Sequence, residues 1–295
     1  MGQLVLNRPF FEDEAAFAFS LSTRPFSQLF SALDFGRVAP VGFVFLEKVA
    51  TNVLGDFDWA YRVVPAAASL CLIYQVWKLS LDSSRKTFLV LMLFLNPFFL
   101  RYTVEAKPYI VDALVAMLLL RYLLKKQFSA LPLVLGAGVW FSYTPLIALV
   151  PVTVISFSYR NDAEFSLKAW AMGVSSIVFN YLATLYGHSN RQSMTGYWEW
   201  FGGVFVSGHN YPRFVYHAVE MAAVSFKSVS DLLYLSGIKE IGALVILTLI
   251  VISVRSEVGR LTALLLASHV VFATLRLYPV DERLMLVLCR CSVVS

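Results

Sequence analysis

The sequence predicts an all-α fold, a polytopic transmembrane helical bundle with interfacial amphipathic helices in the first external loop. Three observations predict it. Of the 295 residues, 58% are hydrophobic and only 15% are charged, whereas soluble domains carry about 25% charged residues. The mean hydropathy is positive, at +0.69. Apolar runs near the length of about 17 to 20 residues that crosses a bilayer alternate with short polar breaks.

Residues 1–62 form the predicted first external segment, which carries an acidic pair and membrane-surface helices. In its middle, apolar residues recur at helical spacing with polar residues between them: Phe26, Leu29, Phe30 and Leu33. This pattern is typical of an amphipathic helix lying on a membrane. Val38–Leu54 is more apolar, but it contains Glu47-Lys48, and a charge pair is costly at the bilayer centre. We therefore place this segment in the interface as well.

Residues 63–187 and 238–295 are predicted to be transmembrane, the second set incomplete, with a second external segment at 188–237. The stretch Ser129–Ser158 suits a hairpin of two crossings, because Pro145 near its middle interrupts a helix. This gives eight crossings, with a ninth starting near Leu284. The single spans are Val63–Leu79, Thr87–Arg101, Pro108–Leu124, Lys168–Gly187, Ile238–Val254 and Arg260–Arg276.

Basic residues in the short loops predict the orientation. The breaks at 78–86, 121–126, 160–168 and 255–260 fall on one side and contain 10 basic residues against 4 acidic ones. We assign that side to the cytoplasm, so residues 1–62 and 188–237 lie on the outer face. The net charge of +5 does not indicate nucleic-acid binding, since the basic residues mostly sit at span ends. Gly136-Ala137-Gly138 lies inside an apolar run and indicates helix packing rather than a phosphate loop.

The outer face collects the ionisable residues that are hardest to explain structurally. Glu12-Asp13-Glu14 precedes an apolar helix, where acids favour the positive end of the helix dipole; a general base or metal ligand is an equal alternative. Glu105, Lys107 and Asp112 stand at a span entrance beside Arg101. Ionisable groups at such a depth are functional candidates, although a local ion pair would also explain them.

Two further groups lie later in the chain. Arg283, together with Arg101 and Lys107, could clamp a phosphate, whereas a single such arginine is more often an interface anchor. Trp198 belongs to an aromatic loop that suits an interface belt better than a sugar-stacking platform. The four histidines are scattered, so a histidine-based metal site is not expected.

In their order along the chain and their common position on the outer face, these segments resemble the C-type (GT-C) superfamily of membrane glycosyltransferases. That superfamily includes protein O-mannosyltransferases and lipopolysaccharide-sugar transferases. The resemblance covers nearly the whole chain, although no one motif is highly specific. The family has a span before its acidic pair and further spans at its C-terminal end, so the chain resembles a member truncated at both ends. The matching segments are Asp13-Glu14, Ala39–Phe43, Gly55, Tyr61-Arg62, Asn96–Phe99, Tyr102–Tyr109, Trp140–Tyr143, Pro145, Tyr197-Trp198, Tyr278-Pro279 and Arg283.

The resemblance implies transfer of a sugar from a polyprenyl-phosphate donor to an envelope glycan, lipid or protein. It implies a protein of the bacterial inner membrane whose active site faces the periplasm. No organic cofactor is implied; Asp13 is either the base or a ligand of a divalent cation, Mg²⁺ or Mn²⁺. The implied site residues are Asp13, Glu14 and Glu105 for catalysis, Lys107, Arg283 and Arg101 for the donor phosphate, and Tyr109, Asp112, Trp198 and Tyr278 for the substrate.

Two alternatives stay open. A transporter or flippase for a lipid-linked saccharide would place charges or broken helices near the midplane, often in repeated halves. Here the ionisable residues gather at one face and the two halves differ, which favours the enzyme. The second alternative is an inactive, truncated fragment of the transferase.

Overall fold

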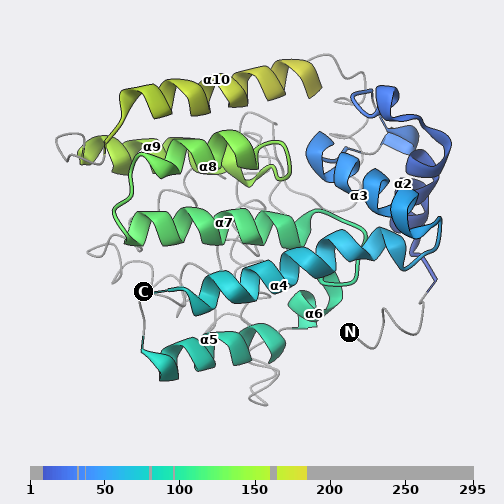
Figure 1. Ribbon diagram of the computed structural model, residues 1–295, viewed down its shortest axis with the longest axis horizontal. Coiled ribbons are helices and arrows are strands. Elements are labelled where there is room, and N and C mark those ends of the chain that lie inside the picture. The colour runs from blue at the N-terminus through green and yellow to red at the C-terminus, as the bar shows by residue number, and fades with distance from the viewer. Residues whose placement is uncertain are drawn as a thin grey trace, which may run out of the picture. The chain divides into compact units, whose positions relative to one another are not determined.

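The computed structural model describes residues 9–31, 33–36, 38–79, 82–95, 97–159 and 165–184, and every regular element in these residues is a helix. The predicted all-α fold class is therefore confirmed for this part of the chain (Figure 1). The chain divides into two compact units. The first comprises Met1–Arg121, Pro132–Pro145 and Leu167–Met194, and the second the remainder. All of the site described below lies in the first unit.

The N-terminal part of the first unit is built from two helices and three short 3₁₀ turns. Helix α2 begins with three acidic residues, which favour the positive end of the helix dipole. Helix α3 follows Pro40 and ends where Gly55 adopts a φ of +94°, a conformation that suits glycine. Figure 1 shows α2 and α3 side by side. The elements are α2 (Glu12–Thr23), η1 (Phe26–Gln28), η2 (Asp34–Gly36), α3 (Val41–Leu54) and η3 (Ala60–Arg62).

The predicted spans of the described region coincide with helices, with one difference. The stretch Thr87–Arg101 is divided between two helices around residue 96. No helix in the described part of the chain is both long enough and apolar enough to cross a membrane. The spans predicted after residue 187, the ninth crossing and the segment 188–237 lie outside the described residues. The helices are α4 (Val63–Trp77), α5 (Ser83–Leu95), α6 (Pro97–Tyr102), α7 (Tyr109–Leu124), α8 (Ala130–Gly138), α9 (Thr144–Ser158) and α10 (Leu167–Thr184).

The stretch Ser129–Ser158 forms two helices, as its length and proline predicted. Helix α8 ends at Gly138 and α9 begins at Thr144, so Pro145 stands in the first turn of the second helix. Proline is well tolerated there, because the first turn has no intrahelical partner for the missing N–H. Asp112 fixes the intervening turn from outside: its carboxylate accepts hydrogen bonds from the Ser142 hydroxyl at 2.6 Å and from the Tyr143 N–H at 3.2 Å.

The prediction of an amphipathic helix around Phe26–Leu33 is wrong. The segment holds one 3₁₀ turn, Phe26–Gln28, and then an irregular loop. Pro25 precedes the turn, and the Ser31 hydroxyl donates to the carbonyl of Gln28 at 2.5 Å, which favours a turn over a continued helix. The predicted apolar face is also divided: Leu29 and Leu33 are buried, whereas Phe26 and Phe30 are exposed.

Helix α3 buries its charged side chains and exposes apolar ones, the opposite of a helix that faces water. Glu47 and Lys48 are buried, and the Lys48 ammonium donates to the carbonyl of Leu21 at 2.6 Å. The exposed residues on the same helix are apolar, as Phe45 and Val53 show. The interfacial placement of this segment was predicted from Glu47 and Lys48. Both side chains face the protein interior, where Lys48 bonds to a backbone carbonyl of α2. Neither oxygen of the Glu47 carboxylate has a hydrogen-bond partner among the described residues, and burial raises its pKa well above the ordinary value.

Helices α8 and α10 pack through glycine, as the predicted packing role of Gly136 required. A Cβ atom on Gly136 would lie 2.8 Å from the Cα of Gly173, and one on Gly173 would lie 2.1 Å from the carbonyl oxygen of Pro132. The Ser176 hydroxyl reinforces the contact by donating to the Gly136 carbonyl at 2.6 Å. Close backbone approach of this kind needs a residue without a side chain.

Gly173→Ala is therefore expected to destabilise the fold by about 1–3 kcal/mol, the usual cost of overpacking a tight contact. The measurement is thermal unfolding of the purified protein in detergent. Ala171→Val is the matched control, because Ala171 is exposed on the same helix and its substitution should leave the melting temperature nearly unchanged. Equal melting temperatures for Gly173→Ala and the wild type would contradict the close α8–α10 contact.

Candidate functional site

The acidic start of α2 and the loop between α6 and α7 meet in one cluster of charged side chains. The Lys107 ammonium lies 2.7 Å from the Asp13 carboxylate and 3.4 Å from the Glu105 carboxylate. These three residues come from two segments more than 90 positions apart in the sequence. The structure thus brings together the acidic pair and the loop residues that the sequence singled out separately.

Glu14 forms the buried centre of the cluster. Its carboxylate accepts hydrogen bonds from the Phe11 N–H at 3.1 Å and the Ala106 N–H at 3.0 Å, and it lies 3.4 Å from the Arg62 Nε. The bond to Phe11 is half of a capping box, because Glu14 is the third residue of α2. The bond to Ala106 ties the α6–α7 loop directly to the start of α2. Glu14 and Arg62 are 0% and 1% exposed, so their charges neutralise each other inside the protein.

Glu105 and Arg101 complete the cluster on its other side. Glu105 is buried, and its carboxylate lies 3.4 Å from the Arg101 Nε one helical turn earlier. The Arg101 guanidinium is largely exposed and stacks over the Phe11 ring, 5.4 Å from its centroid. Arg101 therefore stands between the buried Glu105 and the solvent, where a guanidinium can still bind an anion.

The cluster has an inner and an outer layer. Glu14, Arg62 and Glu105 are at most 2% exposed, whereas Asp13 and Lys107 are 23% and 14% exposed. The inner charges fix the backbone of α2 and of the loop. The outer pair reaches the surface. Of the described residues in the cluster, Asp13, Lys107 and Arg101 are the ones accessible to a ligand.

The environment of Lys107 keeps it protonated. Burial works to lower its pKa, but the Tyr109 phenol oxygen, the hydrogen bond that Lys107 donates to Asp13 and the Glu105 and Asp13 charges outweigh that effect and raise the pKa above 10.5. The stabilisation from this cation is complete below pH 10.5 and is lost only as the pH rises through the higher value in the folded protein.

A pH titration of the Lys107→Met variant and the wild type checks this assignment. The difference in melting temperature between the two should stay constant from pH 6 to pH 9 and shrink only in strongly alkaline solution. A difference that disappears near neutral pH would contradict a raised pKa for Lys107.

The predicted substrate-binding residues are placed differently. Tyr109 lies beside the cluster: its ring is 5.6 Å from the Lys107 ammonium and 4.9 Å from the Tyr102 ring, both measured to the ring centroid. Asp112 directs its carboxylate to the turn between α8 and α9, so it holds that turn in place. Three predicted site residues lie outside the described residues: Trp198, Tyr278 and Arg283.

A cation site is not formed by the described residues. They contain no group of three or more histidine, cysteine, aspartate or glutamate side chains that could hold a metal ion. The Asp13 carboxylate is instead paired with the Lys107 ammonium, at 2.7 Å. A divalent cation on Asp13 is thus not supported by the residues around it, and we derive no step through one.

Sequence reasoning did not assign a role to Arg62. It stood in a segment quoted for the family resemblance, directly before an apolar run, and an arginine at that position usually reads as an interface anchor. The structure turns it inward, against Glu14 and 5.1 Å from the Phe10 ring centroid. No local sequence signal identified this role, because the burial of Arg62 depends on the packing of α2 against the start of α4.

The geometry of the cluster is the main evidence on function, because comparison with other proteins adds none. No family model, no curated protein and no solved structure matches the chain.

Proposed function

We propose that this protein is an integral membrane glycosyltransferase that moves a sugar from a polyprenyl-phosphate donor to an envelope glycan, lipid or protein. The observation that supports it is the Asp13–Lys107 pair. A carboxylate and an ammonium lie 2.7 Å apart at the surface of a cluster whose inner charges are buried and paired. Catalytic groups need such a fixed support, because a transition state is stabilised best by charges that do not have to reorganise.

The outward faces of the helices support a membrane setting. Large apolar side chains are exposed on several helices of the first unit. Exposed apolar side chains of this kind suit helices that contact lipid. By the loop charges, the cluster then faces the periplasm of the bacterial inner membrane. Examples are Leu70, Tyr74 and Trp77 on α4, Phe88 and Leu91 on α5, and Met172, Phe179 and Leu182 on α10.

Asp13 is the base in the proposed reaction. The donor phosphate binds Lys107 and Arg101, because its two unesterified oxygens accept charge-assisted hydrogen bonds from an ammonium and, in bidentate fashion, from a guanidinium. Lys107 then turns from Asp13 toward the phosphate, which leaves the Asp13 carboxylate able to accept a proton. The acceptor hydroxyl gives that proton to Asp13 and attacks the anomeric carbon of the sugar.

Bond breaking follows the same geometry. As the new glycosidic bond forms, the bond between the anomeric carbon and the phosphate oxygen breaks, and its electron pair leaves with the polyprenyl phosphate. Negative charge rises on that phosphate in the transition state. Fixed cations beside it are most effective in a site that excludes water. Glu105 and Glu14 act as positioning residues, since they hold Lys107, Arg101 and the loop but are themselves buried.

Deletion of the gene tests the proposed function. We expect mass spectrometry of envelope glycans and lipid-linked sugars to show loss of one sugar and accumulation of its polyprenyl-phosphate donor. The wild-type gene should restore both. Accumulation of the donor on the cytoplasmic leaflet only would instead indicate the transporter, and an unchanged profile would indicate an inactive chain. Either of these two results would overturn the proposal.

A further inference from the structure

The loop between α3 and η3, residues 55–59, carries two aromatic rings at the protein surface. The Phe57 and Trp59 rings are stacked, with centroids 6.2 Å apart and planes that differ by 7°. Phe57 is 57% exposed, and Trp59 is half-buried. Because the rings are nearly parallel, their faces point in the same direction and form an apolar platform that a ligand can reach.

Backbone contacts hold this platform in place. The Gly55 N–H donates to the Thr51 carbonyl at 2.9 Å, the Phe57 N–H to the Gly55 carbonyl at 2.9 Å, and the Ala60 N–H to the Phe57 carbonyl at 2.8 Å. The Phe57 ring also lies against Gly55, where a Cβ atom would be 2.6 Å from the nearest ring atom. A side chain that is already ordered loses little conformational entropy when a ligand binds.

Polar groups flank the two rings. Asp56 precedes Phe57, and the Tyr61 phenol donates to its Oδ1 atom. Burial and the Asp56 carboxylate raise the pKa of that phenol, so it stays a donor at neutral pH and orients Asp56. Asp58 and the indole N–H of Trp59 have no hydrogen-bond partner among the described residues. The loop therefore offers carboxylate acceptors and one N–H donor next to the rings.

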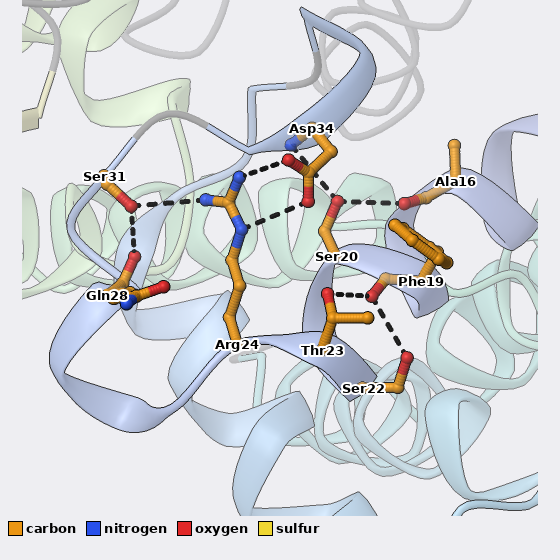
Figure 2. Close-up of polar contacts among 9 residues, drawn as sticks. All are labelled: Ala16, Phe19, Ser20, Ser22, Thr23, Arg24, Gln28, Ser31 and Asp34. Carbon is orange, nitrogen blue, oxygen red and sulfur yellow. Dashed lines mark hydrogen bonds and ion pairs between the residues drawn. The ribbon is translucent and has the colours of Figure 1, made fainter.

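Asp34 shows how a carboxylate with a structural role is bonded in the same part of the chain (Figure 2). The Arg24 guanidinium donates to both of its oxygens, from Nε at 3.1 Å and from Nη2 at 2.6 Å. The Asp34 N–H donates to the Ser20 hydroxyl at 3.2 Å. Asp58 is also half-buried but has no such support within the described residues. Its carboxylate is thus available to the hydroxyl groups of a ligand.

Stacked rings beside available carboxylates fit a saccharide. One face of a pyranose ring consists of axial C–H bonds and packs on the negative face of an aromatic ring, while the sugar hydroxyls donate to carboxylates. Anchors in the membrane interface instead combine aromatic rings with Lys and Arg, whereas both charges beside these rings are negative. The same charges repel the phosphate of a lipid-linked donor, so the composition of the loop favours the sugar of an acceptor.

The loop adjoins the charged cluster. The Arg62 N–H donates to the Trp59 carbonyl at 3.1 Å, and the Arg62 Nε lies 3.4 Å from the Glu14 carboxylate. Glu14 follows Asp13 in the first turn of α2. One residue, Arg62, therefore connects the aromatic platform to the helix that carries the proposed base.

We propose that residues 55–59 bind a saccharide of the acceptor, with the sugar ring on Phe57 and Trp59 and its hydroxyls donating to Asp56 and Asp58. Of the three acceptor classes, this selects the glycan. The role as an acceptor subsite rests on the proposed function. Saccharide binding itself requires neither Asp13 nor the donor, so it is measured separately from transfer.

Saturation-transfer difference NMR tests the binding. The purified protein is placed in lipid nanodiscs, because sugar-based detergents would compete for the loop. The probes are methyl β-D-glucopyranoside, methyl β-D-galactopyranoside and methyl N-acetyl-β-D-glucosaminide. We expect at least one of them to bind in the millimolar range. The axial protons on one face of its ring should receive more saturation than those on the other face, because only one face lies on the aromatic platform.

Matched variants assign the binding to the loop. Phe57→Ala should weaken it about 2- to 10-fold, the effect of one aromatic contact, whereas Phe45→Ala, at an exposed ring near the start of α3, should not change it. Asp58→Asn should weaken it about 2- to 10-fold, the effect of one hydrogen bond. Asp34→Asn removes the same charge from a carboxylate that Arg24 already occupies and should leave binding unchanged. None of the four substituted side chains is buried, so the variants should fold.

The transfer assay tests the acceptor role. Phe57→Ala should raise the KM for the acceptor and leave kcat and the KM for the donor near their wild-type values. Binding of a glycoside by a wild-type protein that transfers nothing would contradict the proposed function while supporting the saccharide site. Transfer by a wild-type protein that binds none of the three glycosides would overturn the site alone.

Three further results would overturn the saccharide site: equal saturation on both faces of the sugar ring, equal binding by Phe57→Ala and Phe45→Ala, or crosslinking of residues 56–59 by a phospholipid that carries a diazirine on its acyl chain. The last result would assign the two rings to the membrane.

Discussion

Replacing Asp13 by asparagine is expected to lower sugar transfer by about 10²- to 10⁴-fold, the range that a positioned general base contributes. The amide keeps the shape of the side chain and can still lie beside Lys107, but it cannot accept the proton of the acceptor hydroxyl. The measurement is the amount of transferred sugar in membranes of the deletion strain that express each variant at equal level. Donor binding through Lys107 and Arg101 should persist, so the loss should appear in kcat rather than in KM.

The matched control is Glu12→Gln. Glu12 precedes Asp13 on the same first turn of α2, is exposed, and makes no contact in the cluster. Both substitutions remove one negative charge from the helix N-terminus, so a dipole effect alone would alter both variants similarly. We expect Glu12→Gln to transfer sugar at the wild-type rate. Equal activity of the two variants would remove Asp13 from the chemistry.

Arg62→Met is expected to produce the largest loss of stability. Breaking a buried ion pair by removing one partner costs about 3–5 kcal/mol, because the remaining charge stays buried without compensation. Here that charge belongs to Glu14, which is 0% exposed and also ties the Ala106 N–H to α2. The measurement is thermal unfolding of the purified protein in detergent.

Two comparisons show whether the loss comes from uncompensated charge. Adding Glu14→Gln to Arg62→Met removes the remaining charge and should recover part of the lost stability. Arg24→Met removes an arginine from an ion pair that is partly exposed, with Arg24 at 15% and Asp34 at 36%. Pairs of that kind contribute about 0–1 kcal/mol, so its effect should be small. Similar effects for Arg62→Met and Arg24→Met would contradict the buried layer of the cluster.

The sequence predicted the helices that are defined by the length of an apolar run or by a proline that interrupts one. Apolar length predicted α4, α7 and α10, and Pro145 predicted the division between α8 and α9. The all-α class follows from the same patterns. The loop after Pro25 was predicted as a helix from the helical spacing of Phe26, Leu29, Phe30 and Leu33. Such spacing also occurs in a loop when side-chain hydrogen bonds replace the helix ladder.

The contacts of the site could be predicted only in part. The family resemblance implied one site for Asp13, Glu105, Lys107 and Arg283; the structure brings the first three together, and Arg283 lies outside the described residues. Sequence reasoning could not separate the buried Glu14 from the accessible Asp13, since adjacent residues on a helix point in different directions and the direction depends on tertiary packing. The burial of Arg62 and Glu47 likewise depends on which elements pack against them. No local pattern encodes that.

Transfer by the purified protein tests the central proposal most directly. Wild type, Asp13→Asn and Glu12→Gln are reconstituted in phospholipid vesicles with the radiolabelled lipid-linked sugar that accumulates in the deletion strain and an envelope extract as acceptor. We expect wild type and Glu12→Gln to move the label from the lipid fraction to the acceptor, and Asp13→Asn to leave it on the lipid. Transfer by Asp13→Asn at the wild-type rate, or no transfer by the wild type, would contradict the proposed role of the Asp13–Lys107 pair.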